Sequence, residues 1–388
     1  MRTPTAQTHA DEKRRVLLFI DSLKAGGAER TVLSWASWLN QEGWKVTLLT
    51  SKGAEHDFYP CPVELERLLE PGSQDGGRAG LRWPFRMLAL WRLLRRGRYS
   101  LLIGVTTLPA IKLTLSAIGS GIPVVVAERN YPPARPLALP WRLLRRVTYP
   151  YASLHLVQTE RIATWLRQKG LAKRTACLPN AVVWPQISHP PCIAPEDWLS
   201  GEARLMLAVG TKLHQKGFDR LVEAFGRIAQ RWPDWHLAIL GIDHTLYKGV
   251  DQVSALEAIL PDPSVRRRLI FPGKVGNPAD WYARTDLFVL SSRYEGFPNV
   301  LLEAMAAGCA CLATDCPTGP SEMIKHGYNG WLVPEYDAIE ALSEGMEHLM
   351  AAPLLREHLA TAATQVRNIH APSAIQAGFI SILNTVGP

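Results

Sequence analysis

The sequence predicts an α/β protein built from two Rossmann-like domains, each with a parallel sheet. Apolar runs of strand length alternate with helical patterns from Arg15–Ile20 onward. These runs are continuously apolar, which is typical of parallel strands covered on both faces. The alternation stops in a proline-rich segment near the middle of the 388 residues and then restarts, and this length suits two domains better than one. We therefore expect two sheets whose carboxyl ends face an interdomain cleft.

The first domain is expected to span residues 1–180. It opens with a strand at Arg15–Ile20, a glycine-containing loop at Asp21–Gly27 and a helix at Ala28–Glu42, whose apolar residues fall on one side. A strand at Lys45–Thr50 completes a βαβ unit. Further strands are predicted at Leu101–Val105, Pro123–Ala127 and Leu154–Gln158.

The second domain is expected to span residues 204–370, after a linker at 181–203. The linker prediction depends on Pro179–Pro195, which is rich in proline and lacks periodicity. Residues 371–388 are expected to form a C-terminal helix, which could pack back on the first domain. Within the second domain, helices are predicted at Gly217–Arg231 and Pro298–Ala307, and strands at Arg204–Gly210, His236–Leu240, Leu269–Phe271, Asp286–Leu290 and Cys309–Ala313.

The composition favours a cytoplasmic protein without a membrane span. Hydrophobic residues make up 47% of the chain and charged residues 20%, close to globular averages. The longest apolar runs fall far below the roughly 18 residues that a span needs. Met1–Arg15 is polar and lacks the apolar centre of a signal sequence. The six cysteines include no CxxC pair, so we expect buried free thiols and neither a metal site nor disulfides.

Positive charge is concentrated in the first half of the chain. Residues 1–195 contain 27 Lys and Arg against 13 Asp and Glu, a net +14, whereas residues 196–388 contain 16 against 22, a net −6. Within the first half, Leu81–Arg98 and Leu137–Tyr151 interleave arginines with Trp and Leu. Such basic amphipathic stretches fit the surface of an anionic bilayer. The alternative is that the Leu and Trp side chains face the domain core while the arginines lie in water.

The segment between the strand at Asp286–Leu290 and the helix at Pro298–Ala307 has the features of a phosphate-binding helix start. Gly296 lets a ligand approach the backbone closely, and Pro298 suits the first turn of a helix. A helix N-terminus attracts phosphate through its free amides and its partial positive charge. The amides expected to point outward are those of Asn299, Val300 and Leu301.

Three charged side chains accompany this helix start. Glu295 stands in the loop and Glu303 in the second turn of the helix, where both could accept hydrogen bonds from sugar hydroxyls. Lys216, just before Gly217 at a second predicted helix start, can aim a cation at a diphosphate. The alternatives are two surface glutamates and a solvated lysine. Because both helix starts belong to one domain, we expect them to converge on one diphosphate.

In combination these motifs resemble the retaining GT-B glycosyltransferases of the large family 4, over nearly the whole chain. The matching segments are Ala25–Arg30 (AGGAER), Pro179–Val182 (PNAV), Val209–Gly217 and the Glu295…Glu303 pair, which is the family's E-x7-E motif. The resemblance implies a GT-B fold. It also implies transfer, with retention, of a hexose or N-acetylhexosamine from a nucleotide sugar, for which UDP is the expected nucleotide. The implied acceptor is a saccharide linked to a membrane lipid (polyprenyl diphosphate), in the assembly of a bacterial surface polysaccharide or glycan.

The resemblance also implies roles for individual residues. Glu303 would bind the donor ribose, Glu295 the transferred hexose and Lys216 the diphosphate. The implied catalytic residues are Glu295, Lys216 and Glu128. The implied donor-binding residues are Gly26, Gly27, Lys212, Lys216, Lys274, Val275, Glu295, Gly296, Phe297, Asn299, Val300, Leu301 and Glu303.

Two positions leave the family pattern open. Similar sequences usually carry arginine directly after the strand-ending glycine, where this chain has Thr211. Either Lys212 supplies the second cation or the site works with one. Glu128 follows the strand at Pro123–Ala127, at a place where relatives often have a polar active-site residue. The alternative for Glu128 is an ion pair that caps a helix or faces the linker.

Neither a metal ion nor a cofactor is expected. The chain has no D-x-D motif and no His/Asp cluster with ligand spacing, and a lysine with a helix N-terminus can neutralise a leaving diphosphate. The nucleotide sugar is then a substrate. The other expected partners are the lipid-linked saccharide and the inner face of the cell membrane, to which the protein would bind peripherally.

Two other functions remain open from the sequence. A nucleotide-sugar epimerase of the same architecture would need no membrane surface. A basic nucleic-acid-binding protein is suggested by the pI near 9.2 and the interleaved aromatic residues, but the chain has no recognised binding motif, so nucleic acid is not an expected partner. A nicotinamide-dependent dehydrogenase is disfavoured, because no G-x-G-x-x-G follows the first strand.

Overall fold

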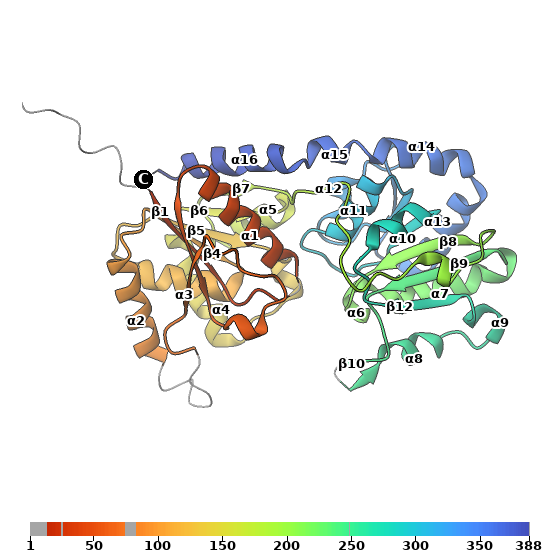
Figure 1. The fold of residues 1–388 in the computed structure, drawn as a ribbon, viewed down its shortest axis with the longest axis horizontal. Helices are drawn as coiled ribbons and strands as arrows, with labels where there is room; N and C mark the ends of the chain where they lie inside the picture. The colour runs from red at the N-terminus through yellow and green to blue at the C-terminus, as the bar shows by residue number, and fades with distance from the viewer. Residues whose placement is uncertain (1–13, 25, 74–82, 248, 388) are drawn as a thin grey trace, which may run out of the picture. The chain divides into compact units, whose positions relative to one another are not determined.

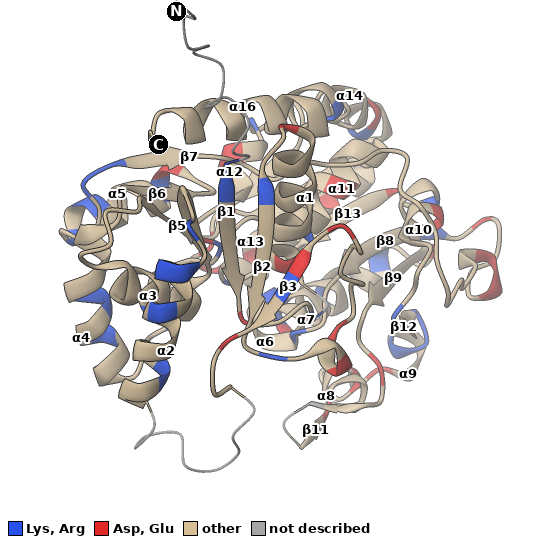
Figure 2. Cartoon of the chain, turned by 60° about the vertical axis from the view of Figure 1, so that its left-hand side comes forward, with Lys and Arg blue, Asp and Glu red and all other residues tan. Residues whose placement is uncertain are grey.

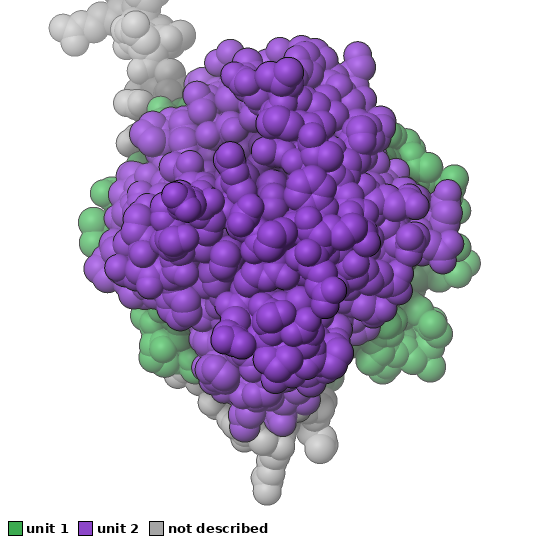
Figure 3. Space-filling model, turned by 90° about the vertical axis from the view of Figure 1, so that its right-hand side faces the viewer, with its two compact units in different colours: residues 1–178, 376–388 green, residues 179–375 purple. Residues whose placement is uncertain are grey.

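The structure is a computed structural model that describes residues 14–24, 26–73, 83–247 and 249–387 (Figure 1). The chain forms two compact units, and Figure 3 colours them separately. Unit 1 comprises residues 1–178 and 376–388, and unit 2 comprises residues 179–375. Met1–Lys13, Ala25, Leu81 and Arg82, on which parts of the predictions depend, lie outside the described residues.

Unit 1 contains a seven-stranded parallel sheet with the order β3-β2-β1-β4-β5-β6-β7. In the central strands every residue is buried or nearly so, because helices cover both faces of the sheet. The strands are β1 (Arg15–Ile20), β2 (Lys45–Thr50), β3 (Glu66–Leu69), β4 (Leu101–Val105), β5 (Val124–Glu128), β6 (Leu154–Val157) and β7 (Thr175–Cys177).

The helices of unit 1 follow the strands as the sequence pattern predicted. Phe379, near the chain end, stacks on Trp35 with the ring centroids 4.8 Å apart. Phe379 is fully buried there, so the C-terminal helix packs on unit 1 through this residue. The helices are α1 (Gly27–Gln41), η1 (Ala54–His56), α2 (Trp83–Arg96), α3 (Thr107–Ala117), η2 (Pro132–Ala134), α4 (Leu139–Thr148), η3 (Tyr149–Tyr151), α5 (Glu160–Gln168) and α16 (Pro372–Asn384), the last of which begins in unit 2.

Unit 2 contains a six-stranded parallel sheet with the order β12-β9-β8-β13-β14-β15. Successive residues of β8 and β13 enter two different hydrophobic clusters: Met206 and Val289 join one, and Leu207 and Phe288 join the other. Both faces of the sheet are therefore covered, as in a doubly wound fold. The strands are β8 (Arg204–Val209), β9 (Trp235–Leu240), β12 (Leu269–Gly273), β13 (Leu287–Leu290), β14 (Cys311–Thr314) and β15 (Trp331–Val333); β10 (Leu246–Tyr247) and β11 (Val250–Asp251) form a separate hairpin.

The helices of unit 2 include the one expected at Gly217–Arg231, which begins one residue later, at Phe218. Gly217 adopts a left-handed conformation with φ of 66° and separates it from a short helix at Leu213–Lys216 that the sequence did not predict. The helices are η4 (Pro195–Asp197), α6 (Leu213–Lys216), α7 (Phe218–Ile228), η5 (Ala229–Arg231), α8 (Gln252–Glu257), α9 (Pro263–Arg266), α10 (Pro278–Arg284), α11 (Asn299–Ala307), α12 (Pro320–Met323), α13 (Ala338–Ala351), α14 (Pro353–Ala363) and α15 (Val366–Ile369).

The six cysteines are free thiols, but only half of them are buried. Cys309, Cys311 and Cys316 are buried, whereas Cys61 is half-buried and Cys177 and Cys192 are exposed. The expectation of buried thiols is wrong for these three. Across the described ranges, no helix combines the length and the apolar composition that a membrane crossing requires.

A buried histidine in β6 makes the stability of unit 1 depend on pH. His155 is fully buried beside the Tyr149 ring, and burial lowers its pKa from 6.5 to about 4. The unfolded chain then binds this proton more readily, so stability is lost as the pH falls from 6.5 towards 4. Between pH 7 and pH 5 we expect this residue to cost about 2 kcal/mol of unfolding free energy.

Urea unfolding of the wild type and of His155→Phe at both pH values measures this term. The variant should lose less stability at pH 5 by about that amount, because Phe keeps an aromatic ring beside Tyr149 without a titrating group. Equal losses in the two proteins would show that His155 is not the responsible group.

Candidate functional site

Glycines end three neighbouring strands at the carboxyl edge of the unit 2 sheet. Gly210 follows β8, Gly241 follows β9, and Gly273 is the last residue of β12. Gly241 donates its amide to Gly273 O at 2.7 Å. Gly241 has φ of 90°, and a Cβ there would lie 2.6 Å from Gly210 O. The backbones therefore approach one another more closely than other residues would allow. A Cβ on Gly210 would meet Lys216 Cγ at 2.7 Å, so the lysine side chain lies over this edge.

Lys216 is held in place by a turn that only glycine fits well. It is the last residue of α6, and Gly217 then reverses the chain into α7. A Cβ at Gly217 would overlap Ser291 O, and the Ser291 hydroxyl donates to Lys216 O at 2.8 Å. Lys216 thus ends one short helix, which was not predicted, and lies just before the longer helix α7, as the sequence predicted.

The structure brings Lys216 and Glu295 together. Lys216 Nζ lies 2.8 Å from Glu295 Oε1, and the side chains are 16% and 6% exposed. The Ser292 hydroxyl donates to the same carboxylate oxygen at 2.6 Å. A lysine ammonium has three N–H donors, so Lys216 can keep this bond while it binds a phosphate oxygen. The sequence predicted both residues at the site, but not Ser292.

The loop that carries Glu295 runs into the N-terminus of α11. Pro298 is the N-cap residue, and Leu301 donates its amide to Pro298 O at 3.0 Å. The prediction that the Leu301 amide points outward is therefore wrong, because the first turn of the helix uses it. The amides of Asn299 and Val300 precede this first bond, so they are the helix-end donors that can bind an anion.

Two residues after β14, which the sequence analysis did not identify, support this loop. The Thr318 hydroxyl donates to Glu295 O. A Cβ on Gly319, whose φ is 101°, would overlap the Pro298 ring. Both lie in the segment CPTGP, whose two prolines and glycine signal a tight turn. The sequence gives no indication that this turn packs against Glu295.

Glu303 lies in the second turn of α11, next to a buried tyrosine. The Tyr282 hydroxyl lies 3.4 Å from both Glu303 Oε2 and Val300 O. Burial, followed by the Glu303 charge, raises the pKa of Tyr282 well above 10, so Tyr282 remains a hydrogen-bond donor. Phe297 differs from the prediction, because its side chain is 8% exposed and belongs to the core of unit 2. Only the backbone of Phe297 is available to a donor.

The remaining predicted donor residues of unit 2 lie at the same carboxyl edge. Lys212 is the N-cap residue of α6, and both it and Thr211 are exposed. Lys274 is exposed after the end of β12, and Val275 packs against the core. Gly296 is half-buried between Glu295 and Phe297. The sheet order places β12 two strands from β8, so Lys274 and Lys216 follow different strands of one edge.

The segment that begins unit 2 contacts the same helix end. Asn180 Nδ2 donates to Asn299 Oδ1, and Val182 N donates to His370 O at 2.9 Å. The His370 ring lies 3.0 Å from Asn180 O through Nδ1 and 5.9 Å, between centroids, from Phe297. The Pro179–Val182 motif is therefore part of the structure around the start of α11.

In unit 1, Glu128 is an interior residue. The strand β5 continues one residue further than predicted, so Glu128 is its last residue and is fully buried. Its carboxylate accepts hydrogen bonds from the hydroxyls of Thr107 (3.0 Å) and Tyr149. Burial raises its pKa, and these two hydrogen bonds oppose that shift. This geometry does not support the predicted role of Glu128 as an acid–base residue that contacts substrate, nor the alternative of an ion pair at the linker.

Gly26 and Gly27 stand at the start of α1. Gly26 is the N-cap residue in an extended conformation, with φ of −176°, which any residue can adopt. A side chain at Gly26 would overlap the Glu29 carboxylate. Glycine therefore leaves room for the Glu29 carboxylate at this position, and the donor-binding role that the resemblance implies for Gly26 and Gly27 stays a prediction.

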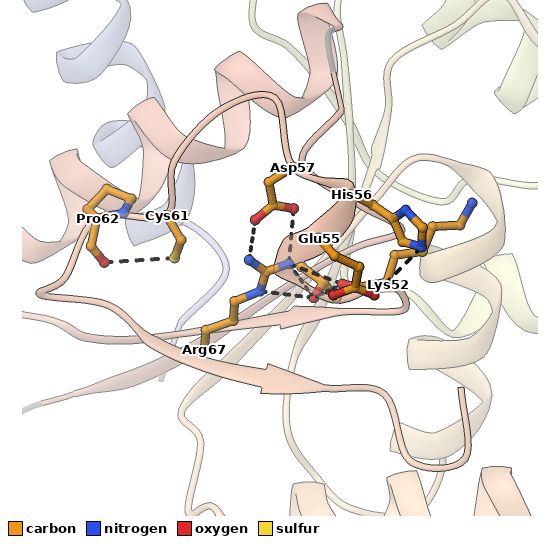
Figure 4. A network of polar contacts seen from close by, with 8 residues as sticks. Lys52, Glu55, His56, Asp57, Cys61, Pro62 and Arg67 are labelled. Atoms are coloured by element: carbon orange, nitrogen blue, oxygen red, sulfur yellow. Dashed lines mark hydrogen bonds and ion pairs between the residues drawn. The ribbon is translucent and has the colours of Figure 1, made fainter. Parts of the chain in front are cut away.

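The loop after β2 is fixed to the carboxyl edge of the unit 1 sheet by Arg67. Its guanidinium forms an ion pair with Asp57, and Nη2 donates to Lys52 O at 3.0 Å (Figure 4). It also lies 3.2 Å from Thr50 Oγ1. The sequence analysis found no sign of this network, because Arg67 lies in β3, an edge strand without an apolar run.

The two predicted amphipathic stretches of unit 1 form α2 and α4, which contact each other through Trp83 and Trp141 (ring centroids 6.4 Å apart). Their inner faces join the core and their outer faces leave apolar side chains exposed, so the alternative that all Leu and Trp side chains face the core holds only for the inner faces. Figure 2 shows Lys and Arg residues on both helices. The exposed apolar residues are Phe85, Leu88, Trp91, Leu139, Leu143, Val147 and Tyr151, and the exposed arginines of the two helices are Arg92, Arg95, Arg96, Arg142 and Arg146.

Two family models match the chain, one on each domain. Residues 195–366 match the model described as "Glycosyl transferases group 1", and residues 26–181 match the "Glycosyl transferase 4-like domain". Among solved structures, sucrose-phosphate synthase from Thermosynechococcus elongatus has a TM-score of 0.77 at 19% identity, covering 96% of this chain and 99% of that one. Anabaena Alr3699/HepE in complex with UDP and glucose has a TM-score of 0.76 at 18% identity, covering 96% and 100%. These likenesses show the GT-B fold.

Three curated relatives differ in how much of their length the chain spans. An exopolysaccharide phosphotransferase of Streptomyces coelicolor is 30% identical over 66% of this chain, which spans 25% of that protein. The amylovoran biosynthesis glycosyltransferase AmsD of Erwinia amylovora is 25% identical over 95% of this chain and 99% of its own. An N-acetylgalactosamine-N,N'-diacetylbacillosaminyl-diphospho-undecaprenol 4-alpha-N-acetylgalactosaminyltransferase of Campylobacter jejuni is 26% identical over 88% and 91%.

Proposed function

We propose, given that this chain belongs to the group 1 glycosyltransferases, that it transfers a hexose or N-acetylhexosamine from UDP to a lipid-linked saccharide in bacterial polysaccharide synthesis. The observation that carries the donor half is the contact of Lys216 with Glu295 beside the N-terminus of α11. UDP is proposed because a protein of the same fold holds it. The acceptor class is proposed because a relative similar over most of its length is named for a diphospho-undecaprenol substrate.

The donor is proposed to bind along the carboxyl edge of the unit 2 sheet. Lys216 Nζ and the amides of Asn299 and Val300 would hold the diphosphate, since a fixed cation and a helix N-terminus both favour that charge. Glu303 would accept from the ribose hydroxyls, and Glu295 from hydroxyls of the transferred sugar. The site then needs no metal ion, because these donors neutralise the leaving group. Lys212, exposed at the start of α6, is the proposed second cation in place of the family arginine.

We propose that transfer proceeds with retention. The acceptor hydroxyl attacks the anomeric carbon on the face from which the diphosphate leaves. The bond from C1 to the phosphate oxygen breaks as the new glycosidic bond forms, and the departing diphosphate takes the hydroxyl proton. Lys216 lowers the barrier because it stabilises charge that grows on the leaving oxygen in the transition state.

A donor screen followed by a transfer assay tests this function. Thermal unfolding with UDP-, GDP- and ADP-sugars should show stabilisation by UDP-sugars, because ligand binding to the native state raises its stability. The stabilising donor is then incubated with and without a polyprenyl-diphosphate-linked saccharide. An α-linked product from an α-donor is expected only with the acceptor. An epimerised nucleotide sugar without acceptor, or no stabilisation by any of the donors, would contradict the proposal.

The outer surface of α2 and α4 is proposed to bind an anionic membrane. Exposed apolar residues such as Phe85 and Leu143 alternate there with arginines, and each basic residue near such a surface contributes about 1 kcal/mol. Changing Arg92, Arg142 and Arg146 together to Gln should therefore weaken vesicle binding roughly 100-fold.

Co-sedimentation with phosphatidylglycerol-containing vesicles measures this loss. The matched control changes three exposed arginines of unit 2, Arg227, Arg231 and Arg267, to Gln and should bind like the wild type. Equal losses in the two triple variants would indicate a general effect of net charge. Retention on duplex DNA without binding to vesicles would favour a nucleic-acid partner.

A further inference from the structure

Arg293 joins the loop that carries Glu295 to the turn that carries Lys216. Its guanidinium forms a two-point ion pair with Asp219, from Nη1 to Oδ1 at 2.7 Å and from Nη2 to Oδ2 at 2.6 Å. Nη1 also donates to His214 O at 2.8 Å, and the Arg293 amide donates to Gln215 O at 2.9 Å. His214 lies in α6 and Asp219 in the first turn of α7. One side chain therefore binds both helices that flank Gly217.

This junction determines where Lys216 lies. Gly217 is the turn between the two helices, in a left-handed conformation. Because a glycine backbone is permissive, other contacts must hold the relative direction of the two helices. A lysine side chain has many rotamers, so a 2.8 Å contact with Glu295 forms consistently only if the two backbones are held together. Three neutral bonds contribute: from the Ser291 hydroxyl to Lys216 O, from the Gln215 side-chain amide to Tyr294 O, and from the Arg293 backbone amide to Gln215 O. The ion pair of Arg293 is the charged member of this set, and charged hydrogen bonds are the stronger ones.

We propose that Arg293 is a positioning residue of the donor site, a proposal that depends on the function proposed above. It holds the turn between α6 and α7 against the donor loop, so that Lys216 and Glu295 face the same ligand. In this proposal Arg293 acts through its bonds to Asp219 and His214 O and does not bind the diphosphate. Lys212 remains the proposed second cation.

The chemistry of the pair explains why arginine is required. A carboxylate accepts two parallel N–H bonds from a guanidinium, whereas a lysine ammonium supplies one point of charge. The side chains are 23% and 37% exposed, so solvent weakens the pair only in part. Burial raises the pKa of Asp219, but the hydrogen bond and the charge of Arg293 outweigh burial, so the pKa is lowered overall. Both groups therefore stay charged at neutral pH.

Substitutions on the two sides of the pair distinguish positioning from direct binding. UDP affinity is measured by calorimetry for Arg293→Lys, Arg293→Ala, Asp219→Asn and the exchanged pair Arg293→Asp with Asp219→Arg. If Arg293 positions Lys216, Asp219→Asn weakens UDP binding roughly as much as Arg293→Ala, about 10-fold. Arg293→Lys falls between Arg293→Ala and wild type, and the exchanged pair recovers part of the loss.

Direct binding predicts the opposite sign for Asp219→Asn. Removing a negative charge beside an anion site strengthens the attraction for diphosphate and frees the guanidinium, so UDP would bind equally well or more tightly. That result would overturn the proposal. Arg227 also lies on α7 and pairs with Glu223 of α7 and Glu340 of α13. Arg227→Ala breaks these pairs, is the matched control and should leave UDP affinity unchanged.

Thermal unfolding of each variant separates the donor site from general stability. A lower melting temperature with unchanged UDP affinity would show that Arg293 only stabilises unit 2, which also contradicts the proposal. Failure of the proposed function would give a different result: the wild type would bind none of UDP, GDP and ADP. Asp219→Asn replaces one carboxylate oxygen with an amide nitrogen group of similar size. This variant therefore remains informative if Arg293→Ala does not fold.

Discussion

Lys216→Met is expected to lower turnover roughly 10²–10³-fold while the fold is kept. Removing one preorganised donor to a developing negative charge costs this much in other enzymes. Met has a similar length and can lie over Gly210, which the lysine side chain now contacts. The substitution leaves Glu295 without its cation in a 6% exposed position, so a loss of stability is also expected.

Initial rates with saturating acceptor and a range of donor concentrations give this effect. The fall should appear mainly in kcat, because the charge that Lys216 stabilises grows as the diphosphate leaves. Lys325→Met, at an exposed lysine of unit 2 with no assigned role in the site, is the matched control and should change kcat by less than about 10-fold. If Lys216→Met altered only KM, the lysine would bind the ground state and transition state alike, and its catalytic role would be wrong.

The sequence predicted the interior strands almost to the residue, because their burial determines their composition. β1, β2 and β4 have the predicted bounds, and each is a continuous apolar run between turns. Three edge strands, β3, β7 and β15, were not predicted, whereas the mostly buried edge strand β12 was. Most residues of the three are only partly buried or exposed, so a polar residue such as Arg67 is tolerated and the apolar signal is lost. The apolar pattern of a sequence reports burial. An exposed edge strand is recognised only by its pairing with the neighbouring strand in the sheet.

The site was predictable where its residues are close in sequence and not where the contacts are distant. Glu295 and Glu303 belong to one loop and helix, so their spacing was visible. The support from Tyr282 and Thr318 comes from other elements of unit 2. The break at Gly217 is also tertiary, because the carbonyl of Ser291 occupies the space beside it. The burial of Glu128 was missed for the same reason, since Tyr149, which covers it, follows a different helix.

Glu295→Gln is expected to reduce turnover roughly 30- to 100-fold, with little change in UDP affinity. The amide keeps the shape of the carboxylate, but it loses the charge that Lys216 pairs with and that sugar hydroxyls would bind. Glu303→Gln should behave differently, because its proposed partner is the ribose, which is bound equally in the ground state and the transition state. UDP affinity should then fall several-fold while kcat changes little.

Calorimetry with UDP and rate measurements on both variants separate these two roles. Glu295 lies 2.8 Å from Lys216, whereas Glu303 lies 3.4 Å from the neutral Tyr282 hydroxyl, so only the first substitution changes the charge beside the leaving group. Unchanged UDP affinity in Glu303→Gln would remove the ribose assignment. If the two variants had the same profile, the carboxylates would act as one unit on one part of the donor. The division between sugar and ribose would then have to be abandoned. It requires that Glu295, in the loop before α11, and Glu303, in the second turn of α11, contact different groups of the donor.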